Sequence, residues 1–516
     1  MATTPTLTRA LAPELGVPPA LLALPEKAVQ FGTGAFLRGF VDHFLDAANR
    51  EGRFNGRVVA VGSTGSGRDR ALTDQDGLYT LVARGLERGA AREDVRVVAS
   101  VSRALSAATE WDAVLDVARS PALELVFSNT TEVGIALDEG DEAELSPPRS
   151  FPGKLTRFLY ERARAFDFAP ERGVAVVPCE LIEDNGARLR EIVGALAARW
   201  QLDARFVPWL DAAVPFCNTL VDRIVPGAPS AEEGAALTAR LGYRDELLTT
   251  CELYRLFAIE GDDALRARLA FADADPGVVV TPDVRPFRER KVRLLNGTHT
   301  AMVPLALLAG CETVREAVTH DAVGPYVRRV MLDEIVPTLG DPDAEAFAQA
   351  VLDRFGNPHV RHALFDITLQ ATMKLRVRLV PTIQRAVARA GHPPALLTLG
   401  FAAFLLFARG ELQARRAAAG LPVPADDQAA RLRELWETHA PGASAGDAGL
   451  AAFVRATLVD ATLWGVDLTT LTGFEPAVRD ALARLMTDGA VATLEQTLAL
   501  TLERPQAHLL AASTPA

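Results

Sequence analysis

The chain has 516 residues, of which 49% are hydrophobic and 23% are charged. This composition excludes a disordered chain, and the length is typical of roughly two to four globular domains. The formal net charge of −12 argues against a nucleic-acid-binding protein, which needs a basic surface, but it allows a small anionic ligand in a locally positive pocket.

The cysteines and the apolar segments indicate in which cellular compartment the protein is found. No cysteine lies within four residues of another, so neither a zinc site nor a redox pair is predicted, and we expect reduced thiols. The N-terminus lacks the pattern of a secretory signal, and the longest apolar runs, such as residues 399–408, are too short to span a bilayer. We expect a cytoplasmic protein with no metal ion and with neither nucleic acid nor a membrane as partner. The sequence leaves the oligomeric state open, and a monomer is compatible with it.

The first half of the chain alternates short apolar segments with helical patterns. Helices are predicted over residues 35–48 and 188–199, and residues 218–282 could add further strands. The five valine-rich segments that predict buried strands are residues 28–31, 57–61, 95–101, 123–127 and 173–177. Strands that alternate with helices predict a parallel, doubly wound sheet.

The second half changes character after about residue 290. Alanine- and leucine-rich periodic segments predict helices over residues 344–354, 381–390, 394–409, 426–438 and 449–456. The sequence therefore predicts an α/β domain over residues 1–285 and an all-helical domain over residues 286–516.

The first predicted strand runs directly into a G-x-G turn and then a helix. Gly32 permits the tight turn, and Gly34 lets the backbone approach a pyrophosphate at the helix N-terminus. Leu37 replaces the third glycine of the usual dinucleotide fingerprint, and Arg38 could compensate by pairing with phosphate. An ordinary strand-to-helix turn is the alternative. The candidate cofactor-binding residues here are Phe31, Gly32, Gly34, Ala35, Phe36 and Arg38.

The end of the second strand bears on the choice of cofactor. An acidic residue at this point usually binds the adenosine ribose of NAD. No acid stands at the strand end, where Arg68 would favour a 2′-phosphate and Asp69 could fold back onto the ribose. We favour NAD and do not exclude NADP.

Polar residues follow two later strands. Asn129, Thr131 and Glu132 come after residues 123–127, and Asn185 comes after residues 173–177. Ligands of open α/β sheets bind beyond the carboxyl ends of the strands. We therefore assign the first three residues to the cofactor and Asn185 to the substrate. Ordinary turn chemistry is the alternative.

The helical half begins with the spacing K-x-x-x-x-N-x-x-H. In a regular helix Asn296 and His299 share one face, and Lys291 lies about 80° around the axis from His299. A buried lysine can donate a proton during carbonyl reduction, which arginine cannot do, and Asn and His can stabilise the oxygen. Lys291 is also one of only four lysines, with Lys27, Lys154 and Lys374. A solvated helix end is the alternative.

A second basic cluster lies further along the helical half. Lys374 and Arg378 are four residues apart and could together bind a substrate carboxylate. A solvated basic face is the alternative.

Together these motifs resemble the polyol-specific long-chain dehydrogenase/reductase family, which includes mannitol dehydrogenase. The segments that carry the resemblance are residues 31–38, 74–79, 131–132, 185–186 and 291–299. The resemblance implies a Rossmann-type N-terminal domain, a helical C-terminal domain and metal-independent hydride transfer. It also implies that Lys291 is the acid/base, that Asn296 and His299 surround the substrate oxygen, and that Lys374 contacts substrate.

One departure points to a branch of this family. Mannitol dehydrogenases have an asparagine where Leu181 follows Cys179-Glu180, and the chain is more similar to the hexuronate reductases. This implies NAD(H)-dependent reduction of an open-chain keto sugar acid, in our interpretation tagaturonate to altronate. A fructuronate reductase and a mannitol or polyol 2-dehydrogenase are alternatives. A non-catalytic dinucleotide sensor is a third, although it would not need Lys291, Asn296 and His299 together.

Overall fold

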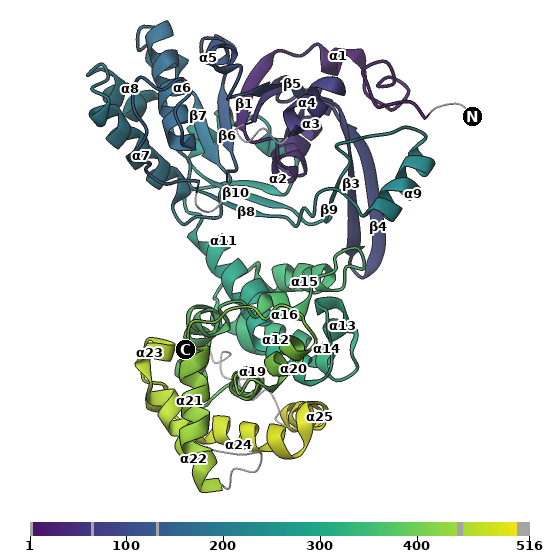
Figure 1. Ribbon diagram of the computed structural model, residues 1–516, viewed down its shortest axis with the longest axis vertical. Coiled ribbons are helices and arrows are strands. Elements are labelled where there is room, and N and C mark those ends of the chain that lie inside the picture. Colours follow the sequence, from purple (N-terminus) through teal and green to yellow (C-terminus); the bar gives the residue numbers. More distant parts are fainter. Residues whose placement is uncertain (1–3, 63–66, 131–133, 441–446, 503–516) are drawn as a thin grey trace, which may run out of the picture. The chain divides into compact units, whose positions relative to one another are not determined.

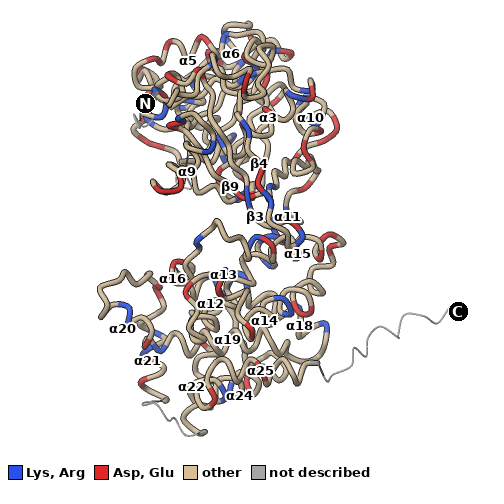
Figure 2. Tube along the Cα trace, turned by 90° about the vertical axis from the view of Figure 1, so that its right-hand side faces the viewer, with Lys and Arg blue, Asp and Glu red and all other residues tan. Residues whose placement is uncertain are grey.

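The computed structural model describes residues 4–62, 67–130, 134–440 and 447–502. The chain forms two compact units (Figure 1). The N-terminal unit comprises Met1–Gly85 and Ala91–Phe287, and the C-terminal unit comprises Leu86–Ala90 and Arg288–Ala516. The predicted division after residue 285 lies two residues before this change of unit and did not anticipate residues 86–90. Figure 2 shows basic and acidic residues interspersed along both units.

The N-terminal unit is built on a five-stranded sheet in which all neighbouring strands are parallel, as predicted. Its order is β5-β2-β1-β6-β7. The chain therefore adds β2 and β5 on one side of β1 and then β6 and β7 on the other side. The point where the order reverses, between β1 and β6, is where ligands of such sheets bind. The strands are β1 (Glu26–Phe31), β2 (Arg57–Gly62), β5 (Val101–Ser106), β6 (Leu125–Ser128) and β7 (Ala175–Pro178).

Successive strand residues point to opposite faces of the sheet. Because both sets are apolar, both faces are buried, one against helices and the other against α3 and a second sheet. Val29 and Val126 pack under α5 (Trp111–Ala118), α6 (Phe151–Ala165), α7 (Asn185–Arg199) and α8 (Phe206–Ala213). Ala28 and Phe127 face α3 (Val41–Arg50) and a second sheet. That sheet has the order β11-β10-β8 and contains β8 (Thr219–Asp222), β10 (Leu256–Glu260) and β11 (Val278–Thr281).

Two predicted elements of this unit are divided in the structure. Residues 95–101 are not one strand, since β4 (Ala90–Val98) belongs to a third sheet with β3 (Tyr79–Glu87) and β9 (Thr249–Cys251). Between β4 and β5, Ala99 N donates to Asp46 Oδ1 and Ser100 Oγ to the Asp42 carbonyl, so both residues bond to α3 instead. The predicted helix over residues 35–48 is likewise α2 (Ala35–Arg38) and α3, because the chain breaks at Gly39. A Cβ at Gly39 would lie 2.7 Å from Val225 Cγ1.

The C-terminal unit is helical, as predicted. All five helices expected from periodicity are present, and α19 is almost entirely buried. They are α15 (Ala344–Phe355), α18 (Val380–Ala390), α19 (Ala395–Phe407), α21 (Ala429–His439) and α22 (Asp447–Val459). The buried helix α19 packs against α12 (Thr298–Leu308) and α24 (Phe474–Thr487). In the described part of the chain no single helix is long and apolar enough to cross a membrane, and only α19 with α20 (Glu411–Ala418), bent by 49°, meets that criterion as a pair.

In the described part of the C-terminal unit three segments are π-helices, which the sequence did not predict. They are η3 (Lys291–Gly297), η4 (Val330–Ile335) and η6 (Leu375–Leu379). A π-helix bonds each carbonyl to the amide five residues on, is rare, and occurs frequently at functional sites. Two of the three contain the residues to which we assigned chemistry.

Candidate active site

The glycine turn after β1 has the geometry of a ligand cradle. Gly32 has φ 137°, and a Cβ there would lie 2.9 Å from Leu37 Cδ1 and 3.3 Å from the Asn129 carbonyl. Gly32 is therefore required by the backbone conformation and by packing. A Cβ at Gly34 would meet no protein atom within 4 Å. The space above Gly34 suits a pyrophosphate that approaches the backbone.

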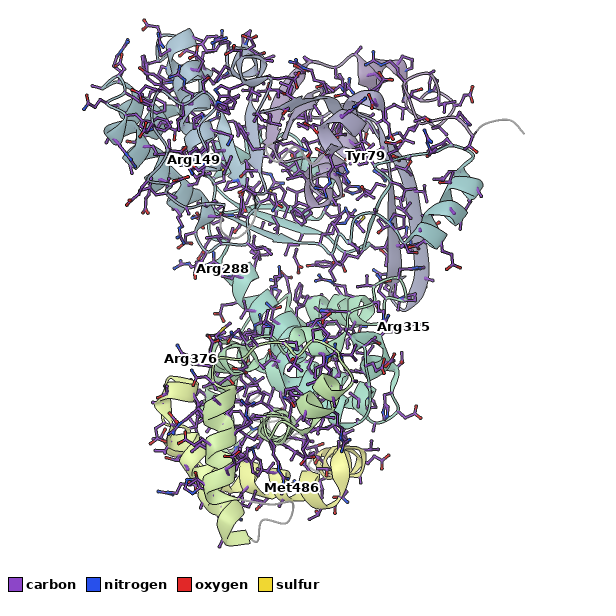
Figure 3. All side chains as sticks on the ribbon, viewed as in Figure 1. Tyr79, Arg149, Arg288, Arg315, Arg376 and Met486 are labelled. Carbon is purple, nitrogen blue, oxygen red and sulfur yellow. The ribbon has the colours of Figure 1, made fainter. Side chains whose placement is uncertain are left out.

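Arg38 supports this turn from within the protein. It is 5% exposed, and its guanidinium donates to the Thr33 carbonyl at 2.6 Å and to Thr249 Oγ1 at 3.2 Å. Arg38 already uses these N–H groups to bond the turn and Thr249, so a phosphate would compete with those bonds for the same donors. Tyr79 (labelled in Figure 3) donates to the Arg38 carbonyl at 2.8 Å and to Asp42 Oδ2 at 3.2 Å. Complete burial raises the pKa of Asp42 to about 7.

The remaining residues of the predicted turn site lie on the surface of α2. Ala35 and Phe36 are partly buried, and Phe36 stacks on Phe40 with ring centroids 4.9 Å apart. At the end of β2, the side chain of Asp69 lies 3.4 Å from where a Cβ of Gly62 would stand. Asp69, in α4 (Arg68–Asp74), thus lies against the strand end although the chain places it seven residues later.

The ends of β6 and β7 are joined by a buried carboxylate. Glu180 is 2% exposed and accepts hydrogen bonds from Ser128 Oγ, Thr130 N and Thr130 Oγ1, each 3.0 Å long. Asn129 donates to the Cys179 carbonyl at 2.8 Å. These bonds join the ends of β6 and β7, next to the point where the strand order reverses. Two further predicted residues, Thr131 and Glu132, lie outside the described residues.

Asn185, which we assigned to the substrate, bonds protein groups with both of its polar atoms. Its side chain is fully buried. The amide nitrogen donates to the carbonyls of Pro178 and Glu180 and to Thr219 Oγ1, and the amide oxygen accepts from Gly186 N and Thr219 N. Because the protein already satisfies both polar atoms, Asn185 holds the end of β7 to β8 and has no group left for a ligand.

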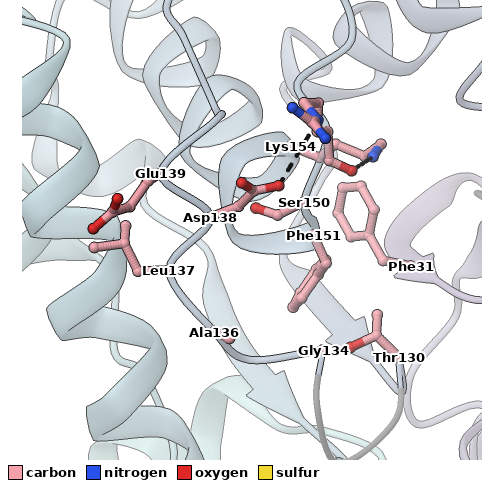
Figure 4. A pocket seen from close by; sticks show the side chains of 11 residues that line it. Phe31, Thr130, Gly134, Ala136, Leu137, Asp138, Glu139, Ser150, Phe151 and Lys154 are labelled. Atoms are coloured by element: carbon pink, nitrogen blue, oxygen red, sulfur yellow. Dashed lines mark hydrogen bonds and ion pairs between the residues drawn. The ribbon is translucent and has the colours of Figure 1, made fainter.

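A cavity of about 540 Å³ opens beside the ends of β1 and β6 (Figure 4). It is lined by Phe31, from the predicted cofactor set, by Thr130, and by Ser150, Phe151 and Lys154 of the α6 N-terminal region. Lys154 donates to the Arg149 carbonyl at 2.6 Å, and burial lowers its pKa. The motifs did not predict this cavity. The one available signal was that Lys154 is among the four lysines of an arginine-rich chain.

In the C-terminal unit, the K-x-x-x-x-N spacing lies in a π-helix and not in the regular helix that we predicted. Hydrogen bonds between residues five apart place Lys291 and Asn296 one turn from each other, whereas an α-helix would turn them to different faces. The expected offset of Lys291 from His299 at 3.6 residues per turn therefore does not apply. Lys291 and Asn296 are both partly buried.

His299 is the second residue of α12, the α-helix that follows η3, and is almost completely buried. It is 7% exposed, its ring lies 4.2 Å from that of Phe355 and 5.2 Å from that of His362 (centroid distances). In the described part of the chain its buried Nδ1 has no hydrogen-bond partner. Burial, and then the charges of neighbouring basic residues, hold its pKa well below the ordinary value. His299 is therefore neutral at physiological pH, and one of its ring nitrogens carries a hydrogen to donate.

The basic residues around His299 form a cationic cluster, which consists of Arg354, Lys374 and Arg378. The Lys374 amine donates to the Ile367 carbonyl at 2.9 Å, and burial followed by the charge of Arg378 lowers its pKa. Within the described residues the partly buried guanidinium of Arg378 has no hydrogen-bond or ion-pair partner. The structure thus brings Lys374 and Arg378 close to His299, and it adds Arg354, which no sequence motif had indicated.

The chain matches two protein-family models. They are the mannitol dehydrogenase Rossmann domain over residues 26–272 and the mannitol dehydrogenase C-terminal domain over residues 283–486.

Curated proteins similar to the chain include the altronate oxidoreductase of Yersinia pestis bv. Antiqua (strain Nepal516), which is 41% identical over 468 residues, covering 90% of this chain and 95% of that protein. The altronate oxidoreductase of Bacillus subtilis (strain 168) is 40% identical over 476 residues, covering 92% and 95%.

Two solved structures show the same fold. The ternary complex of Pseudomonas fluorescens mannitol 2-dehydrogenase with NAD and D-mannitol aligns with a TM-score of 0.64 at 26% identity, covering 97% of this chain and all of that one. A substrate-free D-sorbitol dehydrogenase aligns with a TM-score of 0.73 at 21% identity, covering 95% of this chain and all of that one.

The two glycines of the turn should respond differently to alanine. Gly34→Ala is expected to leave Tm unchanged but to weaken NADH binding at least about tenfold, because its methyl group contacts only the ligand. Gly32→Ala is expected to lower Tm as well, because of its φ and its contact with Leu37. Calorimetry and titration of NADH fluorescence measure both effects. Unchanged NADH affinity in Gly34→Ala would show that no phosphate lies over this glycine.

The carboxyl of Asp42 should make stability depend on pH. It keeps its proton to about pH 7 in the folded chain, whereas an unfolded aspartate loses it near ~4. Between these values the folded state binds more protons, so this contribution to stability falls as pH rises. Asp42→Asn, which stays neutral, should therefore lose less stability than the wild type between about pH 5 and 8. Urea unfolding across this range tests the effect, with the exposed Asp74→Asn as control. Parallel curves for wild type and Asp42→Asn would contradict it.

Proposed function

The chain belongs to the mannitol dehydrogenase family, and we propose that it catalyses the NAD(H)-dependent reduction of tagaturonate to altronate. The family and the altronate oxidoreductases at about 41% identity establish an oxidoreductase that acts on CH–OH groups. The choice of a sugar acid is supported by the names of those relatives and by the basic side chains around His299.

The unpartnered guanidinium of Arg378 is the observation that carries this proposal. A partly buried cation without a counter-charge is costly, and a substrate carboxylate would neutralise it with charge-assisted hydrogen bonds. Lys374 and Arg354 add positive charge around the same histidine. A polyol carries no charge and would leave the guanidinium of Arg378 without a counter-charge. A keto sugar acid therefore fits this cluster better than mannitol or sorbitol does.

The side chains of the first π-helix suit the chemistry at the carbonyl. The hydride that reduces the carbonyl carbon comes from NADH when it is bound. Lys291 donates a proton to the carbonyl oxygen and accepts it again in the oxidative direction. The Asn296 amide and the neutral His299 ring donate hydrogen bonds to that oxygen as negative charge develops on it. Both donors keep their protons throughout, so the single proton exchanged with substrate is that of Lys291.

NAD is the cofactor that the N-terminal unit fits. The open space above Gly34 accommodates a pyrophosphate, and Asp69 lies at the end of β2, where a carboxylate accepts hydrogen bonds from the adenosine ribose. A carboxylate at this point would also repel the 2′-phosphate of NADP. Arg68 is exposed and lies beside it in α4.

Lys291→Ala should abolish turnover and spare cofactor binding. Loss of the proton donor is expected to lower kcat by about 10²- to 10⁴-fold, while the affinity for NADH, which depends on the glycine turn, should stay within about twofold of the wild type. Lys27→Ala, which removes a surface ion pair with Glu124, is the matched control and should be fully active. Wild-type turnover by Lys291→Ala would remove Lys291 from the mechanism.

Arg378→Met should reduce the preference for acids. NADH oxidation is measured with tagaturonate, fructuronate and fructose. We expect the wild type to be most active with tagaturonate, and Arg378→Met to raise the KM for tagaturonate about 10- to 100-fold with little effect on fructose. Arg376→Met, which removes a neighbouring exposed arginine of the same helix, should behave as wild type. If fructose were the best substrate of the wild type, the chain would be a polyol dehydrogenase; turnover of none of the three would favour a sensor.

A further inference from the structure

The two π-helices that carry the proposed chemistry lie against each other. Lys291 and Asn296 belong to η3, Arg378 belongs to η6, and Lys374 immediately precedes η6. The helices pack closely at Gly297, where a Cβ would lie 3.8 Å from the Arg378 carbonyl oxygen. The distance between the proposed proton donor Lys291 and the basic residues Lys374 and Arg378 is therefore set where η3 meets η6.

A buried arginine bridges this contact. Arg293, in η3, is 6% exposed, and its Nη1 donates to the carbonyls of Val377 at 3.0 Å and Arg378 at 3.1 Å. Thr382 Oγ1 also donates to the Arg378 carbonyl, at 3.1 Å. A π-helical turn inside α-helix interrupts the regular ladder of backbone hydrogen bonds, so side-chain donors complete the bonding of its carbonyls. Arg293 thus joins the backbone of η6 to η3.

The other edge of the same guanidinium is held by a carboxylate. Arg293 Nε donates to Glu289 Oε2 at 3.1 Å, and Nη2 lies 3.4 Å from Glu289 Oε1. Arg385, whose side chain is 46% exposed, also donates to Glu289 Oε2, at 3.2 Å. Partial burial acts to raise the pKa of Glu289, but the two arginines hold it below its ordinary value. A charged Glu289 therefore fixes the plane of Arg293 while Arg293 bonds η6.

We propose that Arg293 is a positioning residue for the reaction, which it serves by fixing η6 against η3 and so the distance of Lys374 and Arg378 from Lys291 and Asn296. This inference rests on the proposed function. Arginine is required because its planar group bonds Glu289 with one edge and the η6 carbonyls with the other, which the single ammonium of lysine cannot do. Arg293 itself contacts protein groups and not substrate.

The test compares Arg293→Lys and Arg293→Ala with Arg385→Ala. Displacement of catalytic groups by about 1 Å can cost about 10²-fold in rate, so both Arg293 variants should lose about that much in kcat/KM for tagaturonate and retain the affinity for NADH. Added guanidinium at about 10–50 mM, well below denaturing concentrations, should restore part of the activity of Arg293→Ala. Arg385→Ala removes the other arginine on Glu289, leaves both carbonyl bonds in place and should retain full activity.

Hydrogen exchange gives a readout that does not depend on the substrate. Amides of residues 375–379 should exchange faster in Arg293→Lys than in the wild type and Arg385→Ala. Wild-type kcat/KM in Arg293→Lys would overturn the proposal, and so would failure of guanidinium to restore any activity to folded Arg293→Ala. If the wild type reduced no keto sugar acid, the proposed function would fail and the positioning role with it. If the wild type is active and Arg293→Lys equals it, the positioning role alone fails.

Discussion

The contact between the π-helices η3 and η6 is the interaction on which the candidate site of the C-terminal unit depends. Arg293 donates to the carbonyls of Val377 and Arg378, and Thr300 Oγ1 donates to the Asn296 carbonyl at 2.8 Å. Within η3, hydrogen bonds between residues five apart also place Lys291 and Asn296 about one turn from each other. A regular α-helix at residues 291–297 would turn Lys291 and Asn296 to different faces.

Charge in the C-terminal unit is distributed to favour an anion beside a neutral ring. Burial and the nearby cations keep His299 uncharged, while Arg378 stays without a partner among the described residues. An uncharged donor is suited to hold the oxygen, and a cation is suited to hold a carboxylate. In the proposed function the two tasks therefore belong to different side chains. With this separation, the proposed carboxylate-binding residues could change without altering the proposed groups at the carbonyl.

The N-terminal unit was largely predictable because its signals are local. The valine-rich strands, their order of appearance and the G-x-G turn follow from short segments, and the structure confirms the parallel sheet. The errors arose where a distant contact intervenes. Residues 95–101 change sheets because Asp46 and the Asp42 carbonyl bond to Ala99 and Ser100. Distant contacts also hold Asn185, whose amide bonds Thr219 and the carbonyls of Pro178 and Glu180, and its place after a strand gave no sign of them.

The sequence by itself determined the fold class, the helical second half, the glycine turn and the K-x-x-x-x-N-x-x-H spacing, since periodicity and glycine requirements are properties of consecutive residues. Only the tertiary structure decided the π-helical geometry, the gathering of Arg354, Lys374 and Arg378 around His299, and the position of Asp69 against the end of β2. Each of these depends on packing or desolvation between segments far apart in the chain, and such energies leave no pattern in neighbouring residues.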